Sequence, residues 1–400
     1  MNTTMSKLSI AVRKPVIKLV SKPTPVTYIG PGKAEETGRL LKMLGARKAL
    51  VITDGFLHQS GLLNGLLDSI RRAEVEYTVF DGVQSDPTFA IVASAKQACT
   101  GCDTVVAVGG GSVMDTAKSV AAAVANHTEA EALAGMFKVH RHMLPLIAVP
   151  TTAGTGSETT VAAIISDTAT HSKKQILDPK LVPMFAILDP ELTVGLPKTT
   201  TAYTALDALT HALEAYVAGY ADEETDRQAR IAVRLIFQYL PKVWENPANL
   251  EGREALLTAS FFAGMAFTRT YVGYVHAFAH TIGGKFGVPH GLANAVLLPH
   301  VMRYYLPVCG KRFAQLAKML NLGTPGDSDQ VRATRFVKLL YQLNRQMEIP
   351  KRFEKFPASA IEEVIDMAFQ ECHGVYPVPR YFTREHARKL MEAVCAKEDA

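Results

Sequence analysis

The chain has 400 residues, of which 48% are hydrophobic and 20% are charged, so it is an ordinary globular protein long enough for two domains. Its net charge of +5 comes from lysines and arginines that are scattered in runs no longer than pairs, which argues against a nucleic-acid-binding protein. No apolar segment reaches the roughly 18 residues that a membrane span requires.

The five cysteines are odd in number and scattered, which favours reduced thiols in a cytoplasmic protein over a disulfide framework. Cys99 and Cys102 form a CxxC pair, but there is no second pair to complete a zinc site. We therefore expect neither a redox role nor a structural zinc for this pair.

The first 34 residues contain six lysines or arginines and no acid, as a transit peptide can. However, prolines at positions 15, 23 and 25 would break an amphipathic helix. We expect a solvated tail followed by an early strand.

Strand and helix patterns then alternate up to about residue 195. The predicted strands are 49–54, 76–82, 105–108, 147–149 and 185–190, and the predicted helices are 61–73, 89–100 and a segment that begins near residue 113. Strands that alternate with helices predict a parallel, doubly wound sheet.

From residue 198 onward the strand patterns fade and long helical patterns dominate. The predicted helices are 205–245, 252–268, 294–306, 310–321, 328–348, 359–371 and 383–397. We place the domain boundary at Leu196–Pro197, which gives an α/β domain at 1–197 and an all-helical domain at 198–400.

A glycine triplet follows the apolar strand 105–108. Gly109, Gly110, Gly111 and Ser112 come directly before a helical pattern that carries Asp115 and Lys118. Backbone N–H groups at such a helix start can bind a phosphate, and glycine permits close approach. The pattern is neither GxGxxG nor a Walker P-loop, so phosphate binding and a plain tight turn both remain open. Asp115 either interacts favourably with the helix dipole or contacts a bound ligand.

A second loop rich in glycine and hydroxyl groups follows the strand 147–149. It contains Thr151, Thr152, Thr155 and Ser157. Two such loops after two parallel strands suit a dinucleotide, which binds at the carboxyl ends of the strands. A surface loop is the alternative.

Four residues in the second half have the types and spacing of a divalent-metal site. Asp207 and His211 lie four positions apart and share a helix face, and His276 and His290 lie in a second segment. A carboxylate with imidazoles suits iron, zinc or manganese better than calcium. Glu214, one turn beyond His211, is expected to support the ligand helix.

Several motifs in order resemble those of the group III, iron-activated alcohol dehydrogenases, from about residue 25 to the C-terminus. They are GGGSVMDTAK, PTTAGTGSE, AILDPELT, DALTHALEAYV and VHAFAHTIGGKFGVPHGLANAVLLPHV. The resemblance implies a Rossmann-like N-terminal domain and an all-α C-terminal domain, the dehydroquinate synthase-like fold. It also implies NAD and a metal, Fe²⁺ or Zn²⁺, as cofactors.

The resemblance assigns roles to individual residues. It places the metal ligands on Asp207, His211, His276 and His290, and a proton-transfer role close to the nicotinamide on His280. An acid at Asp54 would hold the adenine ribose and repel a 2′-phosphate, which favours NAD over NADP. The remaining cofactor-binding positions that it implies are Gly109, Gly110, Gly111, Ser112, Thr151, Thr152, Thr155, Lys174 and Leu192.

The chain departs from the family pattern near its expected substrate pocket. Arg269 stands where many members carry Asn, Tyr271 where small residues are common, and Asp86 where Asn is usual. The stretch HGVYPVPRYFT replaces a commoner asparagine-proline run. These departures bear on the substrate.

The sequence therefore predicts a cytoplasmic, NAD-dependent and metal-dependent alcohol dehydrogenase that acts on a small alcohol or aldehyde. A homodimer or larger homo-oligomer is expected, with neither nucleic acid nor membrane as a partner. The alternative is a dehydroquinate-synthase-type lyase, which would bind NAD and metal without net NADH formation. A binding or scaffold protein is the third possibility.

Overall fold

The computed structural model describes residues 3–19, 23–168 and 172–396, with the side chains of 16–19 left out. The chain forms two compact units. A sheet unit comprises Ser21–Leu196 and Pro247–Met265, and a helical unit comprises Met1–Val20, Pro197–Asn246 and Ala266–Ala400. From residue 23 onward the chain passes between them at Leu196–Pro197, at Asn246–Pro247 and again inside α9 (Leu250–Thr270).

A six-stranded parallel sheet lies at the centre of the sheet unit, in the order β1-β9-β6-β4-β2-β3. Its strands are β1 (Val26–Ile29), β2 (Lys48–Ile52), β3 (Glu76–Phe80), β4 (Thr104–Gly109), β6 (Leu146–Pro150) and β9 (Phe185–Leu188). The expected early strand and all five strands predicted from 49 to 190 are present. The central strands are buried along their whole length, because helices cover both faces.

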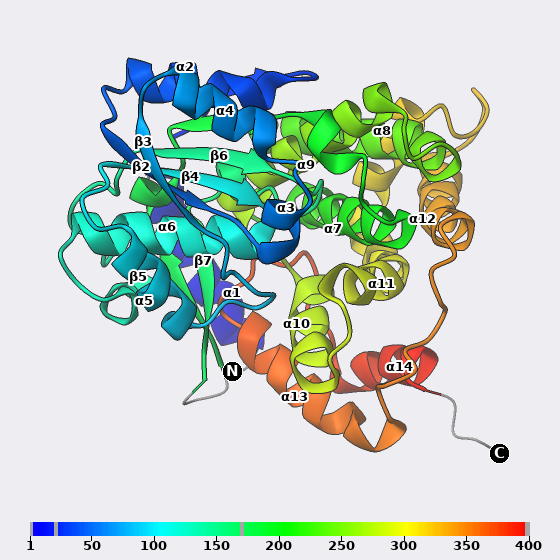
Figure 1. Cartoon of the computed structure of the whole chain (residues 1–400). Helices are drawn as coiled ribbons and strands as arrows, with labels where there is room; N and C mark the ends of the chain where they lie inside the picture. The colour runs from blue at the N-terminus through cyan, green and yellow to red at the C-terminus, as the bar shows by residue number, and fades with distance from the viewer. Residues whose placement is uncertain (1–2, 20–22, 169–171, 397–400) are drawn as a thin grey trace. The chain divides into compact units, whose positions relative to one another are not determined.

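Alternating side chains of the strands pack on opposite faces of the sheet. Val105 and Ala107 join one apolar cluster, which also holds residues of α5 (Phe89–Ala98) and α6 (Gly111–Ala125). Val106 and Val108 join the other, with α2 (Glu36–Met43) and α4 (Asn64–Arg72). Figure 1 shows these two helix pairs on either side of the sheet. The predicted doubly wound α/β fold is confirmed.

A small second sheet was not predicted. It has the order β5-β8-β7, from β5 (Gly135–Met136), β7 (Ala162–Asp167) and β8 (Ser172–Leu177). β7 and β8 pair antiparallel over six residue pairs. Neither segment alternates regularly between polar and apolar residues, since β7 reads AAIISD and β8 reads SKKQIL, so both give weak strand signals.

The helical unit is built from helices, as predicted, although the helix over residues 274–286 was not among those predicted. They are α7 (Lys198–Val217), α8 (Glu223–Glu245), α10 (Tyr274–Phe286), α11 (His290–Met319), α12 (Asp329–Gln346), α13 (Ile361–Cys372) and α14 (Arg384–Val394). The predicted helix 205–245 is in fact two, because Asp222 starts α8 with a capping box to Thr225. The predicted helices 294–306 and 310–321 are one continuous helix, α11, which contains Pro299 and Pro307.

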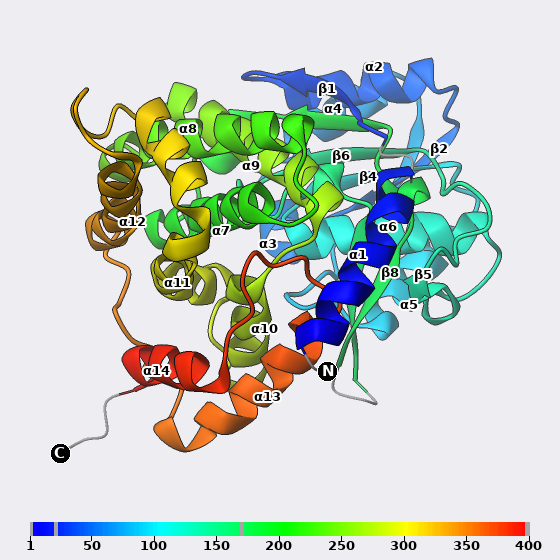
Figure 2. The same cartoon turned by 180° about the vertical axis from the view of Figure 1, so that it is seen from behind.

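The expectation of a solvated N-terminal tail is wrong. Residues Thr3–Leu19 form helix α1, with Pro15 inside it. The Tyr220 hydroxyl donates to the Ile10 carbonyl at 2.9 Å, and the Lys14 ammonium donates to the Gly219 carbonyl at 2.7 Å. Figure 2 shows α1 beside the end of α13, where Ser9 donates to Gly374. These tertiary contacts offset the roughly 3 kcal/mol that a proline inside a helix costs.

Among the helices of the described residues, none combines the length and apolar character needed to cross a bilayer.

Candidate functional site

Three of the four predicted metal ligands converge in the helical unit. Asp207 on α7, His276 on α10 and His290 at the start of α11 each offer one ligand atom, and these atoms all lie within 4.8 Å of one another. The His276 Nε2 is 3.4 Å from Asp207 Oδ1, and the His290 Nε2 is 3.5 Å from the same oxygen. Three helices thus bring together residues that are up to 83 positions apart.

His211, the fourth predicted ligand, lies directly beside this group. Its Nε2 is 4.0 Å from Asp207 Oδ1, as expected for two residues one helical turn apart. Its ring stacks on His276 with a centroid distance of 4.5 Å, and on the other side stacks on Phe267 at 4.2 Å. The ring is therefore held in place next to the three converging atoms.

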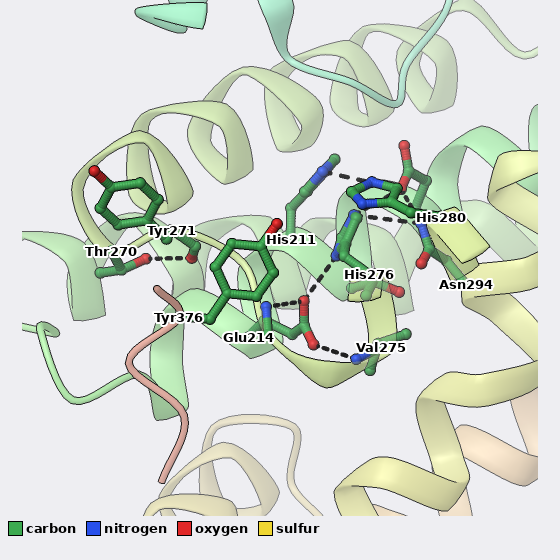
Figure 3. A network of polar contacts seen from close by, with 12 residues as sticks. His211, Glu214, Thr270, Tyr271, Val275, His276, His280, Asn294 and Tyr376 are labelled. Carbon is green, nitrogen blue, oxygen red and sulfur yellow. Dashed lines mark hydrogen bonds and ion pairs between the residues drawn. The ribbon is translucent and has the colours of Figure 1, made fainter. Parts of the chain in front are cut away.

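Glu214 fixes the orientation of His276. Its Oε2 is 2.7 Å from His276 Nδ1, and the backbone N–H groups of Gly273 and Val275 each donate to the carboxylate at 2.7 Å. A Cβ at Gly273 would lie 2.8 Å from Glu214 Oε1, so only glycine fits there. Figure 3 shows the contact between Glu214 and His276. With Nδ1 turned to Glu214, His276 presents Nε2 to Asp207. The sequence predicted a supporting role for Glu214 on the ligand helix, and its contact with His276 on α10 was not predicted.

The electrostatics of the group favour a negative Asp207 and a cation beside it. Burial opposes charge on Asp207, but the adjacent His211 and His290 outweigh it and hold the pKa of the carboxyl well below its usual range. Burial also opposes charge on His276, yet its hydrogen bonds to Asp207 and Glu214 raise the His276 pKa to about 9. Burial lowers the pKa of His290.

Asn294, one turn after His290, is a site residue that the sequence reasoning missed. Its amide donates to Asp207 Oδ1 at 2.7 Å and lies 3.1 Å from His290 Nε2 and 3.3 Å from His276 Nε2. Its own Oδ1 is buried without a hydrogen-bond partner among the described residues. The four-residue spacing from His290 was a signal that would have placed it on the same helix face.

This donor set fits a divalent metal of the iron or zinc type. A buried carboxylate oxygen and imidazole Nε2 atoms are the ligands such ions take, and the Glu214 carboxylate sets the tautomer of one imidazole. The structure places all four predicted ligands in one group, and their assignment as ligands stays a prediction.

The glycine triplet ends β4 and starts α6, with Gly110 as the N-cap of the helix. A Cβ at Gly109 would lie 2.5 Å from Val113 Cγ2, and one at Gly111 would lie 2.8 Å from Thr155 Cγ2. A side chain at Gly109 or Gly111 would therefore clash with the closely packed turn. This packing is compatible both with a phosphate-binding turn and with a plain tight turn. The start of a 15-residue helix remains available to an anion.

Asp54 follows β2, the neighbour of β4 in the sheet, and the chain order of the strands reverses between these two. Ligands of open α/β sheets bind at such a point. The Asp54 side chain is the N-cap of the short helix α3 (Gly55–Gln59) and accepts from the Leu57 N–H at 2.9 Å.

The second loop packs against both the helix start and α9. Thr155 Oγ1 accepts from the Ser157 N–H at 3.2 Å. Gly156 has φ +60°, and a Cβ there would lie 2.7 Å from the Ser260 carbonyl oxygen. Thr151 is buried, and Thr152 lies next to Gly110. The two loops predicted to hold a dinucleotide are thus neighbours.

The last two predicted cofactor positions lie elsewhere in the sheet unit. Leu192 is buried in the 3₁₀ turn Pro190–Thr193, within the cluster that covers one sheet face. Lys174 lies on β8 with its side chain 40% exposed, and its Nζ is 3.8 Å from Asp167 Oδ2.

A buried ionic cluster holds the second loop to α6. The Lys118 ammonium is fully buried and donates to Ser157 Oγ, to Thr160 through both its carbonyl and its hydroxyl, and to the Ala162 carbonyl, at 2.9–3.1 Å. Asp115 accepts from the Ser157 hydroxyl at 2.9 Å and from the Ile164 N–H at 3.1 Å. Asp115 therefore has a structural role in this cluster.

Both cysteines of the CxxC pair are buried, and their surroundings keep the thiols protonated and so disfavour their reaction. Burial raises the pKa of the Cys99 thiol to about 12 and also raises that of Cys102. Thiolates, which bind metals and react, are disfavoured at both positions.

Two of the residues that depart from the expected family pattern adopt unusual backbone conformations. Tyr271 and Asp86 have φ values of +61° and +54°, in the left-handed region that few non-glycine residues occupy. Asp86 is one of the residue types enriched there, and its carboxylate pairs with Lys173 at 2.6 Å. Tyr271 comes just before α10, the helix that carries His276.

Comparison with known proteins matches both halves of the chain to one family. The description "Iron-containing alcohol dehydrogenase" matches residues 23–190, and "Fe-containing alcohol dehydrogenase family, C-terminal" matches residues 201–395. An NAD-dependent methanol dehydrogenase of Bacillus methanolicus is 38% identical over 351 residues, which are 87% of this chain and 92% of that protein.

Two further similarities extend this result. A 1,3-propanediol dehydrogenase of Citrobacter freundii is 38% identical over 330 residues, which are 82% of this chain and 85% of that protein. The crystal structure of a 1,3-propanediol oxidoreductase superimposes with a TM-score of 0.90 at 34% identity, over 94% of this chain and 99% of that one.

Proposed function

Because the chain belongs to the iron-containing alcohol dehydrogenase family, we propose that it transfers hydride between NAD and a small alcohol or aldehyde held by a divalent metal. It is an oxidoreductase that acts on a CH–OH group. The convergence of Asp207, His276 and His290, with Glu214 behind His276, is the observation that carries the metal-dependent part of this proposal.

The metal, Fe²⁺ or Zn²⁺, would be held by Asp207, His276, His290 and His211. When bound, it supplies Lewis-acid polarisation of the substrate oxygen, and NAD supplies the hydride acceptor. Glu214 keeps the His276 Nε2 turned toward Asp207, and the depressed pKa of Asp207 keeps its carboxylate charged at neutral pH. These residues therefore provide the negative, oriented surroundings that a divalent cation needs.

The cofactor would lie across the two loops of the sheet unit. Gly109 to Ser112 offer backbone N–H groups at the start of α6 to a pyrophosphate, and Thr151, Thr152 and Thr155 offer hydroxyls beside them. Asp54 would hold the adenine ribose and select NAD over NADP. Lys174 and Leu192 complete the set that we propose to line the cofactor.

Oxidation of an alcohol to a carbonyl releases one hydride and one proton. His280 lies one turn beyond His276, and its ring stacks against His290 at a centroid distance of 5.3 Å. We assign to its Nε2 the role of accepting the hydroxyl proton, which then passes to solvent; a third of the side chain is exposed. In the reverse direction His280 would return the proton to the forming alcohol.

Arg269 and Tyr271 precede α10, and we propose that they shape the substrate pocket. Their large side chains would restrict it to small alcohols and aldehydes. We further propose that the protein acts in the cytoplasm as a homodimer or larger homo-oligomer. The lyase alternative of the dehydroquinate-synthase type is not favoured, because the family match is to alcohol dehydrogenases.

An assay of the purified protein tests the proposal. Protein loaded with Fe²⁺ or Zn²⁺ is incubated with NAD and a panel of short alcohols and diols, or with NADH and the matching aldehydes, while the absorbance of reduced nicotinamide is followed. We expect turnover that needs the metal and that is weaker with NADP. Metal binding without any NADH formation or consumption across the panel would contradict the proposal.

A further inference from the structure

His280 is held by a carboxylate that the proposed reaction does not use. The Nδ1 atom of His280 is 2.7 Å from Glu371 Oε1, on α13. Glu371 lies 91 positions from His280 in the sequence, so no local spacing signals the contact. Its side chain is 29% exposed, and that of His280 is 32% exposed.

The same carboxylate oxygen receives a second hydrogen bond. The hydroxyl of Tyr376, which follows α13, donates to Glu371 Oε1 at 2.6 Å. Tyr376 belongs to the stretch HGVYPVPRYFT, in which the chain departs from the expected family pattern. Figure 3 draws Tyr376, His276 and His280 within one group of side chains.

Glu371 is ionised in these surroundings. Burial opposes the charge, but the His280 ring and the Tyr376 hydroxyl outweigh it and lower the pKa of the carboxyl. An ionised carboxylate only accepts hydrogen bonds. Both partners of Glu371 must then donate, and the proton of a neutral His280 lies on Nδ1.

The opposite nitrogen of His280 consequently carries the lone pair. The ring cannot turn over without losing its bond to Glu371, and the stacked ring of His290, tilted by only 16°, restricts it further. One imidazole tautomer in one orientation is what a proton acceptor requires.

We propose that Glu371, braced by Tyr376, is a positioning residue that keeps the proton of His280 on Nδ1 and directs its Nε2 to the substrate. This inference rests on the proposed function through the role of His280. Its tautomer part can be tested apart from activity.

The kinetic test uses three variants of the full-length, metal-loaded protein. Glu371→Met removes the acceptor at similar volume, Glu371→Gln keeps an acceptor oxygen without the charge, and Tyr376→Phe removes only the bracing hydroxyl. We expect kcat to fall on the order of 10-fold to 100-fold in Glu371→Met, because carboxylates that hydrogen-bond to functional histidines have effects of this size. KM should stay within about twofold of the unmodified protein. Glu371→Gln should recover part of the loss, and Tyr376→Phe should lose only a few-fold.

A matched control and a double variant separate positioning from general disturbance. Glu363→Gln removes a carboxylate from the same helix, where its side chain is 58% exposed, and should leave kcat unchanged. In a His280→Ala background, Glu371→Met should cause no further loss, because the two residues act as one unit. An equal loss with and without His280, or wild-type kcat in Glu371→Met, would overturn the proposal.

A spectroscopic readout tests the tautomer independently of turnover. In zinc-loaded protein with ¹⁵N-labelled histidines, the His280 signals, assigned by their disappearance in His280→Gln, should show protonated Nδ1 and unprotonated Nε2. Glu371→Met should shift them toward the opposite tautomer or a mixture, and Glu363→Gln should not. Protonated Nε2 in the unmodified protein would refute the inference even if dehydrogenase activity is found. The expected spectrum in a protein without activity would instead refute the proposed function alone.

Discussion

Each unit contains a cluster of charged and polar side chains, and the two clusters compensate their charges in different ways. In the sheet unit, Lys118 brings its own positive charge into a set of oxygens from Ser157, Thr160 and Ala162, and donates to four acceptor atoms. In the helical unit, the atoms that converge on one point belong to Asp207, His276 and His290, the residues that we propose as metal ligands. Buried charge is tolerated only where it is compensated.

The comparison separates a structural cluster from one that we propose to bind a metal. Lys118 connects α6 to the second loop, so its contacts stabilise the fold and the shape of that loop. In the histidine cluster, Glu214 contacts His276 and Asn294 donates to Asp207, so both orient side chains of the proposed metal site. We therefore expect changes in the first cluster to reduce stability, and changes in the second to reduce metal binding.

The largest effect is expected for His276→Ala. Loss of one ligand should remove the metal and lower kcat/KM by at least about 10³-fold, because the several kcal/mol of Lewis-acid stabilisation disappear with it. Metal content after gel filtration and turnover with NAD are measured together. Retained metal with full turnover would show that the helical cluster is not the metal site.

Lys118→Met is expected to destabilise the protein by about 3–5 kcal/mol, because Asp115 and Glu158 stay buried without their cation. Unfolding by urea, followed by circular dichroism, measures the change. Lys173→Met is the matched control: that lysine pairs with Asp86 at the surface, with 49% of its side chain exposed, and should change stability by less than about 1 kcal/mol. Equal effects of the two variants would mean that the Lys118 cluster is not structural.

Glu158→Gln tests the same cluster through pH. Burial raises the pKa of Glu158 to about 7, above its ordinary value of 4.5, so the folded protein holds a proton that the unfolded chain releases. The stability from this proton is fully present below pH 4.5 and is lost as the pH rises through 7.

The unmodified protein should therefore lose on the order of 2 kcal/mol more than Glu158→Gln between pH 5 and pH 7.5. Denaturant unfolding of both proteins at the two pH values provides the measurement. Parallel pH profiles for the two proteins would show that the Glu158 carboxyl is not perturbed.

The smallest effect is expected for Glu214→Gln, because this variant keeps all the predicted metal ligands. Loss of the charge that orients His276 should weaken metal affinity by about 10-fold to 100-fold, measured by competition with a chelator. Folding stability of the metal-free protein should change little compared with Lys118→Met. A variant with unchanged affinity but reduced stability would assign Glu214 to the structural kind of cluster.

Much of the fold was predictable because its signals are local. The apolar strands, the glycine turn at 109–111 and the alternation of strands with helices identified the doubly wound sheet. The four-residue spacing of Asp207 and His211 identified one face of α7, and the resemblance of the motifs linked it to His276 and His290. The structure brings these residues together.

Where the prediction failed, contacts distant in sequence outweighed local preference. Pro15 argued against a helix at the N-terminus, yet α1 forms because Tyr220, Gly219 and Gly374 bind it. Pro299 and Pro307 lie inside one long helix, α11, whose apolar face is buried. Local propensities amount to a few kcal/mol at most, and tertiary packing exceeds them.

The sequence by itself determined which chemistry is present: a carboxylate and histidines in motif order, two loops rich in glycine and hydroxyls, and the strands that precede those loops. Only the tertiary structure decided how these groups are supported, because Glu371 contacts His280 across 91 positions of chain and Tyr376 in turn donates to Glu371. The spacing of residue types along one helix or strand shows only which side chains share a face of that element. The partner of a side chain depends on how separate elements pack, and no local pattern encodes it.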